Sequence, residues 1–190
     1  MRTVDPIRSP KEVDAIKKYL KGSNLRDYTL FVVGVNVALR ITDLLKLRWG
    51  DVLEPNLKNF KDIRIKEGKT KKPRQIKLNK AAQSALMELL ESIGYVDMDE
   101  YIFKSREGAN KQITRQQAQN ILKGASSALK IEGSIGTHSL RKTWGFFAWK
   151  SGVNPAIIME ALNHSNLSIT KRYLGIRQEE INNVYESLNI

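Results

Sequence analysis

The sequence predicts a mainly helical α+β fold that contains one small antiparallel β-hairpin. Apolar residues recur at helical spacing through most of the chain, and only one region alternates apolar and charged residues on both sides of a basic tip. The 190 residues contain no internal repeat, no low-complexity run and no obvious linker. We therefore expect a single domain over residues 1–190.

The first two predicted elements are helices. Ser9 precedes Pro10, and Glu12 follows at the third helical position, which is typical of a capping box. Gly22 stands where a C-terminal capping glycine is expected. Residues 27–37 are nearly all apolar, and a run of this length favours a buried helix over a strand.

The hairpin follows a short helix predicted over residues 42–47 and a turn at 49–51. Residues 60–66 and 74–78 alternate apolar and charged side chains, which indicates two strands with one buried face. The segment between them is rich in lysine, so the hairpin has a basic tip.

The second half of the chain is mostly helical. Asn79 and Thr114 are expected to cap helices that end near residues 92 and 129. Residues 101–103 predict a short strand. Four more helices are predicted over residues 139–150, 155–162, 169–174 and 178–188.

The composition excludes several classes of site. Lys and Arg number 32 against 20 Asp and Glu, giving a formal charge of +12, so a polyphosphate such as nucleic acid is the natural partner. No cysteine is present, which excludes disulfides, Cys-ligated zinc and thiol nucleophiles, and two histidines are too few for a histidine-rich metal site. We expect no metal and no other cofactor. Without a long apolar run, we expect a cytoplasmic protein that does not bind membranes.

Both histidines lie in polar contexts. His138 and Arg141 are three residues apart, so a helix beginning at or just before Ser139 places them on the same side of its first turn. Backbone N–H groups and the helix dipole favour an anion there, although such residues are also common as plain surface groups. His164 follows an apolar helix, and Tyr173 comes nine residues later.

This order of residues resembles the tyrosine recombinase (phage integrase) family. The stretch 38–49, which contains Arg40, is similar to the family's first arginine motif, and the resemblance extends to Tyr173 over most of the chain. It implies the catalytic-domain fold of that family and a site-specific recombinase that cleaves and rejoins DNA through a covalent 3′-phosphotyrosine intermediate, without metal or ATP. The implied catalytic residues are Arg40, Lys69, His138, Arg141, His164 and Tyr173, with Asp43 supporting the site.

The chemistry of a phosphodiester explains the cationic part of this set. Its negative charge must be offset before an oxygen nucleophile approaches, and the transition state spreads charge over the non-bridging oxygens. Arg40 and Arg141 are suited to this because each guanidinium is permanently charged and forks toward two oxygens. His164 is expected to donate a further hydrogen bond.

The remaining residues handle the nucleophile and the leaving group. Tyr173 needs a proton acceptor to attack, and His138 is the candidate. Lys69 is the candidate general acid that protonates the departing 5′ oxygen. A two-residue slip of the hairpin would make one of the neighbouring lysines the candidate instead. These are Lys66, Lys71 and Lys72.

Three features depart from the family pattern. Lys77 stands where the family often has proline after the second strand of the hairpin. Asn163 stands where a glycine is common, a mild change because asparagine tolerates left-handed backbone. Family members usually carry a helical core-binding domain ahead of the catalytic domain, and we expect that domain to be absent here. The chain is then either an excised catalytic domain or a stand-alone short recombinase-like protein.

The expected partner is double-stranded DNA. Arg, Gln and Lys side chains on the helix 114–129 predict a major-groove element, although a Gln-rich helix is equally typical of a solvated face. The candidate DNA-binding residues are Arg115, Gln116, Gln119, Lys123, Lys71 and Lys72. The resemblance further implies a homo-oligomer, a tetramer on DNA, together with accessory DNA-binding proteins where the target requires them, and service to a mobile element. The apolar face of the last helix packs either on a neighbouring protomer or in cis.

Two other functions fit the same sequence. A non-catalytic, recombinase-derived regulatory module would bind DNA without forming a covalent adduct. A type IB-like topoisomerase would form the adduct but would need no paired sites.

Overall fold

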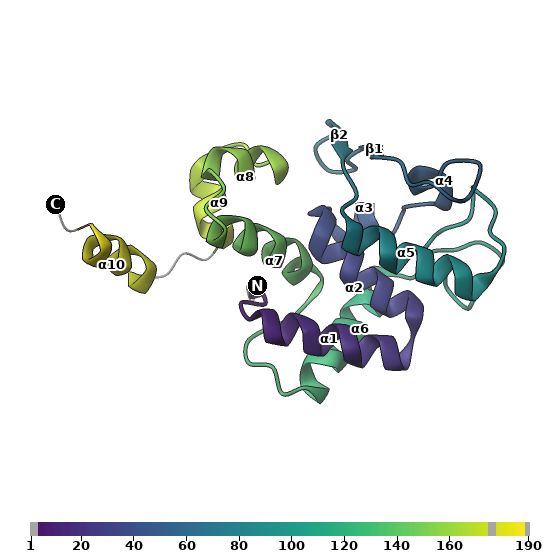
Figure 1. Cartoon of the computed structure of the whole chain (residues 1–190), viewed down its shortest axis with the longest axis horizontal. Coiled ribbons are helices and arrows are strands. Elements are labelled where there is room, and N and C mark those ends of the chain that lie inside the picture. The colour runs from purple at the N-terminus through teal and green to yellow at the C-terminus, as the bar shows by residue number, and fades with distance from the viewer. Residues whose placement is uncertain (1–3, 175–177, 189–190) are drawn as a thin grey trace. The chain divides into compact units, whose positions relative to one another are not determined.

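The computed structural model describes residues 4–174 and 178–188 and confirms the mainly helical fold (Figure 1). In that part of the chain there is one two-stranded antiparallel sheet. The chain divides into two compact units, residues 1–144 and 145–190. Whether they act together as one catalytic domain stays a prediction.

The elements of the first unit begin with four helices, followed by the hairpin and two further helices. They are α1 Pro10–Ser23, α2 Leu25–Val37, α3 Ile41–Leu44, α4 Trp49–Val52, β1 Ile63–Lys66, β2 Pro73–Ile76, α5 Lys80–Ile93 and α6 Arg115–Ala128. The boundary between the units falls within α7, Thr137–Lys150. The second unit continues with α8 Pro155–Ala161, α9 Leu167–Leu174 and α10 Gln178–Ser187.

Helix α2 lies at the centre of the first unit, packed against α5 and α1 (Figure 1). Its apolar residues, including the fully buried Leu30, Phe31 and Val33, cover the whole circumference, as expected for a core helix. A Cβ added to Gly34 would lie 2.6 Å from the Cδ1 of Leu140. This glycine therefore allows α7 to approach α2 closely.

The hairpin has the predicted antiparallel pairing, with Ile63 opposite Ile76 and Lys66 opposite Pro73. Residues 67–72 form the tip. Ile63 is buried and Ile65 half-buried, and Glu67 continues this alternation as a fully buried side chain. The inward face of β1 thus ends in a carboxylate, next to the basic tip.

The predicted end of the first helix is wrong by two residues. Gly22 lies inside α1, and Asn24 follows the last residue of the helix. The side chain of Asn24 accepts a hydrogen bond from the Asp27 N–H, so this residue also begins α2. At the other end of α1, Ser9 is the N-cap but makes no side-chain capping hydrogen bond, so the predicted capping box is absent.

Two short elements also differ from the prediction. The expected turn at 49–51 is the one-turn helix α4, which the Asp51 carboxylate closes by accepting from the Arg48 N–H at 2.8 Å. Residues 101–103 form no regular strand: Tyr101 makes an isolated bridge with Arg48, and Lys104 makes another with Gln112. No helix in the described part of the chain has the length and hydropathy needed to cross a membrane.

Candidate active site

Arg40 and Arg141, far apart in the sequence, meet at one carboxylate. Arg40 is the N-cap residue of α3, and its Nη1 donates to Oε2 of Glu67 at 2.5 Å. Arg141 lies in the second turn of α7 with only 3% of its surface exposed. Its Nη1 donates to the Ala38 carbonyl at 2.6 Å and lies 3.9 Å from Oε1 of Glu67.

Glu67 also contacts the second strand and the tip of the hairpin. Arg74 Nη1 donates to its Oε1 at 2.9 Å, and the Thr70 hydroxyl donates to its Oε2 at 2.7 Å. Three guanidinium groups therefore lie within 4 Å of one fully buried carboxylate. Glu67 and the three arginines together carry three positive charges and one negative charge, so the cluster is suited to bind an anion.

Glu67 and Arg74 were not among the site residues predicted from the sequence. The single acid in the otherwise basic tip, residues 67–72, looks like a solvated charge. The signal that could have found it is the strand alternation, because Glu67 follows Ile63 and Ile65 on the same face. An acid on the buried face of a strand requires a cationic partner.

Lys69 lies at the exposed tip of the hairpin, two residues after Glu67. The intervening Gly68 donates its N–H to Oδ1 of Asp43 at 3.1 Å, and Asp43 is buried within α3, three residues after Arg40. Asp43 thus contacts the base of the tip. The neighbouring lysines Lys66, Lys71 and Lys72 are also exposed, so the choice of Lys69 stays a prediction.

His138 lies in the first turn of α7, the position predicted for it. Partial desolvation lowers the pKa of its imidazole from the ordinary value, and the positive charges of Arg115, Arg141, Lys142 and Arg40 lower it further. A lowered pKa keeps the ring neutral at pH 7 and able to accept a proton.

His164 and Tyr173 lie together in the second unit. Their ring centroids are 4.9 Å apart in an edge-on arrangement, and His164 Nδ1 lies 3.0 Å from the Thr170 hydroxyl. The turn after α8 places the histidine: Asn163 has φ of 49°, and the His164 N–H donates to the Met159 carbonyl at 3.0 Å. Asn163 therefore adopts a left-handed backbone conformation at the position where a glycine is common.

The six predicted catalytic residues form two groups. Arg40, Lys69, His138 and Arg141 belong to the first unit, and His164 and Tyr173 belong to the second.

The predicted DNA-binding residues of α6 differ in their surroundings. Arg115, Gln116 and Lys123 are exposed. Gln119 is only half-buried, and its Oε1 accepts from the Thr137 N–H at 2.9 Å, which holds the start of α7. On the hairpin, a shallow hollow of about 650 Å³ has Lys71 in its wall. DNA binding by all six residues stays a prediction.

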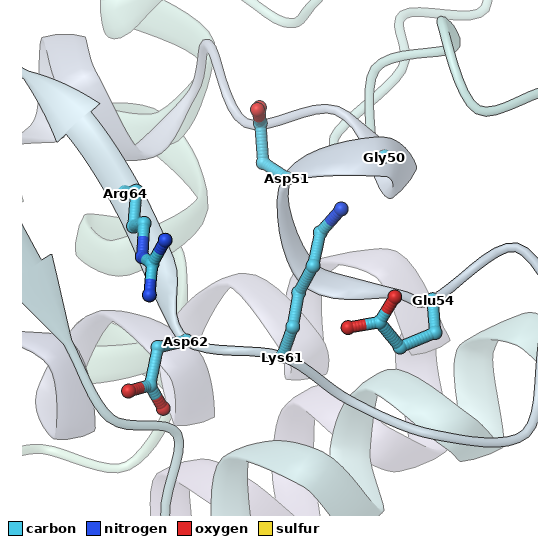
Figure 2. Close-up of a pocket in the computed structure, with 6 residues that line it drawn as sticks. All are labelled: Gly50, Asp51, Glu54, Lys61, Asp62 and Arg64. Carbon is cyan, nitrogen blue, oxygen red and sulfur yellow. The ribbon is translucent and has the colours of Figure 1, made fainter.

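A separate cavity of about 430 Å³ contains none of the predicted site residues. Figure 2 shows acidic and basic side chains sharing its wall. Two of its carboxylates have structural partners, since Asp51 accepts from the Arg48 N–H and Asp62 accepts from the Gln75 amide. No group of three His, Asp or Glu side chains among the described residues could hold a metal ion.

Comparisons with known proteins agree on one family. The model of the phage integrase family matches residues 8–180. The chain is 40% identical over 186 residues to "Probable integrase/recombinase YoeC" of Bacillus subtilis (strain 168), covering 98% of this chain and 97% of that protein. It is 27% identical over 183 residues to "Type 1 fimbriae regulatory protein FimE" of Escherichia coli (strain K12), covering 95% of this chain and 90% of FimE.

Longer relatives match over part of their length. The chain is 27% identical over 190 residues to "Tyrosine recombinase XerD" of Listeria innocua, and spans 61% of that protein. Among solved structures, the XerA recombinase superposes with a TM-score of 0.78 at 18% identity, over 100% of this chain and 67% of XerA. XerH bound to palindromic difH substrate in a post-cleavage complex superposes with a TM-score of 0.77 at 18% identity. The superposition covers 100% of this chain and 55% of XerH. The structural likenesses show the fold, and the family match shows that this chain belongs to the phage integrase family of tyrosine recombinases.

Proposed function

We propose that this protein is a site-specific DNA recombinase that cleaves and rejoins DNA strands through a covalent 3′-phosphotyrosine intermediate. Membership of the family supports this activity. Several relatives are named recombinases or integrases, and the XerH structure is a post-cleavage complex with palindromic difH substrate.

The observation that carries the proposal is the cluster around Glu67. Arg40 and Arg141, the two arginines predicted from the motifs, lie within 4 Å of the same carboxylate. The hairpin that supplies this carboxylate also carries Lys69. Two permanently charged guanidiniums and a mobile ammonium group are what a phosphodiester transition state requires.

The proposed reaction moves two protons and exchanges one bond at phosphorus. The Tyr173 oxygen attacks the phosphorus atom and gives its proton to His138. The bond from phosphorus to the 5′ oxygen breaks, and that oxygen takes a proton from Lys69. The arginines and His164 stabilise the charge on the non-bridging oxygens. Attack by a 5′ hydroxyl reverses the steps and rejoins the strand, so the energy of the bond is retained without ATP.

We further propose that the protein acts as a homo-oligomer, a tetramer on two DNA sites, with DNA that belongs to a mobile element. The DNA-bound neighbours include a lambda integrase dimer, which supports assembly on DNA. Helix α10 and the residue that follows it carry apolar side chains that are exposed in this chain and suited to contact another protein surface. They are Ile181, Val184, Tyr185 and Leu188.

The test is the trapping of a covalent adduct. The protein is incubated with supercoiled and nicked DNA in EDTA, and the products are separated on a denaturing gel. We expect an adduct with the wild-type protein and none with Tyr173→Phe, whose DNA affinity stays within a few fold because no charge is removed. Tyr95→Phe is the matched control, because Tyr95 is a strongly exposed phenol outside both the candidate site and the apolar face of α10, and its loss leaves the adduct unchanged.

Other outcomes identify the competing functions. DNA binding without an adduct on any substrate favours a regulatory module. An adduct with relaxation of supercoils, but without exchange between paired sites, favours a topoisomerase. Strict dependence of cleavage on magnesium contradicts the proposed chemistry.

A further inference from the structure

We propose that Glu67 is a positioning residue, whose buried carboxylate anchors the hairpin tip that carries Lys69 to the Arg40 segment. This inference rests on the proposed function, because it concerns how the general acid of that reaction is held. Glu67 itself does not touch DNA in this account.

The anchor consists of side-chain contacts on both sides of the hairpin. Glu67 bonds Arg40 of the first arginine motif at 2.5 Å, Arg74 of β2 at 2.9 Å and Thr70 of the tip at 2.7 Å. One carboxylate therefore joins the two ends of the tip to each other and to the loop that begins α3.

The backbone next to Glu67 repeats the connection. Gly68 donates its N–H to Asp43, three residues after Arg40, and a Cβ on Gly68 would lie 3.1 Å from the accepting oxygen. Within the tip, Glu67 and Lys72 share a backbone hydrogen bond at 3.0 Å, and the Lys71 N–H donates to the Glu67 carbonyl at 2.9 Å. Lys69 thus belongs to a short turn whose first two residues are both bound to the arginine motif.

Burial and charge make this anchor specific. Glu67 has no exposed surface, and removing a buried carboxylate from three guanidiniums leaves like charges facing one another. The tip would then separate from the Arg40 segment by repulsion, while the strand pairing at Ile63 and Ile76 remains. An exposed acid could not produce this effect, because water would screen its loss.

A first experiment needs no DNA. Hydrogen exchange is measured on wild type, Glu67→Gln and the matched control Glu132→Gln, which removes the charge of an exposed acid. In Glu67→Gln we expect exchange of the Gly68 and Lys71 amides to rise at least tenfold, while α2 and α5 keep their protection. Unchanged exchange at the tip overturns the proposal. Loss of protection in α2 and α5 as well shows that Glu67 holds the whole unit together, which also overturns it.

A second experiment tests whether loss of the Glu67 anchor impairs general acid catalysis by Lys69. The substrate is a duplex captured covalently by the wild-type protein from a randomised DNA pool, made with oxygen or with sulfur at the scissile 5′ bridging position. A thiol has a pKa of about 8.5, so a sulfur leaving group departs without help from an acid. We expect Glu67→Gln, like Lys69→Ala, to cleave the oxygen substrate at least tenfold more slowly than wild type and the sulfur substrate within a few fold of it.

The outcomes separate this inference from the proposed function. A wild-type protein that captures no DNA contradicts the proposed function. If the wild-type protein cleaves and Glu67→Gln is equally slow on both substrates, the defect lies in the arginines. This result contradicts the inference alone. Thr70→Val supplies a milder change that removes one hydrogen bond to Glu67 and no charge. We expect a smaller defect in this variant, again relieved by sulfur, and the same defect on both substrates would contradict the inference.

Discussion

Arg141 combines a structural and a chemical role in one side chain. Its guanidinium donates to the Ala38 carbonyl at 2.6 Å and lies 3.9 Å from Glu67, so its direction is fixed before DNA binds. A lysine at this position keeps the charge but loses the fork. We predict that Arg141→Lys lowers the rate of adduct formation by about 10²-fold, roughly 2.7 kcal/mol. Single-turnover cleavage measures this, and Arg106→Lys, at an exposed site, is the control. Equal rates for Arg141→Lys and wild type would remove Arg141 from the site.

His138 gives a prediction for pH. Its pKa in the folded protein lies below the ordinary value of 6.5, chiefly through desolvation and then through the nearby cations. Between the lowered value and 6.5 the unfolded chain binds the proton more readily, so stability is lost as the pH falls below 6.5, while above that value the residue has no effect. We predict that thermal unfolding shows a larger loss between pH 7.5 and pH 5.5 in wild type than in His138→Gln. Identical losses of stability in the two proteins would show that folding does not lower the pKa of His138.

The residues differ in how far the sequence alone could predict them. Arg40, His138 and Arg141 belong to motifs with fixed spacing, and the structure brings the two arginines to one carboxylate. Glu67 could not be recognised by motif, because its role depends on contacts with Arg40 and Arg74 that come from distant parts of the chain. Gln119 was predicted as a base-reading residue, and only the structure shows its hydrogen bond to the start of α7.

At the level of elements, two helical glycines provide a matched pair. A Cβ on Gly34 in α2 would lie 2.6 Å from Leu140 of α7, whereas a Cβ on Gly22 in α1 would meet nothing within 4 Å. We predict that Gly34→Val destabilises the fold by about 1–3 kcal/mol through overpacking, and that Gly22→Val is close to neutral. Chemical denaturation measures both. Equal effects of the two substitutions would mean that α2 and α7 do not pack closely.

The elements that the sequence predicted well are those with strong local signals. Asn79 and Thr114 each accept a hydrogen bond from the backbone three residues on, and α5 and α6 begin directly after them. The wrong predictions lie where tertiary pairing decides. Residues 101–103 pair only through isolated bridges, and α4 forms because the Asp51 carboxylate closes its first turn. Local patterns do not contain this information.

For the whole molecule, the charge of +12 predicts DNA binding that weakens steeply with salt. Each lysine that contacts a phosphate adds about one unit to the slope of log K against log salt concentration. We predict that Lys123→Gln on α6 lowers this slope by about one. Lys18→Gln on α1, whose ammonium group pairs with Asp14 at 2.9 Å, is expected to leave it unchanged. Equal slopes for Lys123→Gln and wild type would exclude α6 from phosphate contact.

In the proposed reaction, Tyr173 becomes covalently joined to a DNA 3′ phosphate. The most direct measurement digests the trapped adduct with nuclease and protease and identifies the modified peptide by mass spectrometry. We expect a nucleotide attached through its 3′ phosphate to the oxygen of Tyr173. A nucleotide on another residue, such as the exposed Tyr95 or Tyr185, or a link through a 5′ phosphate, would contradict it.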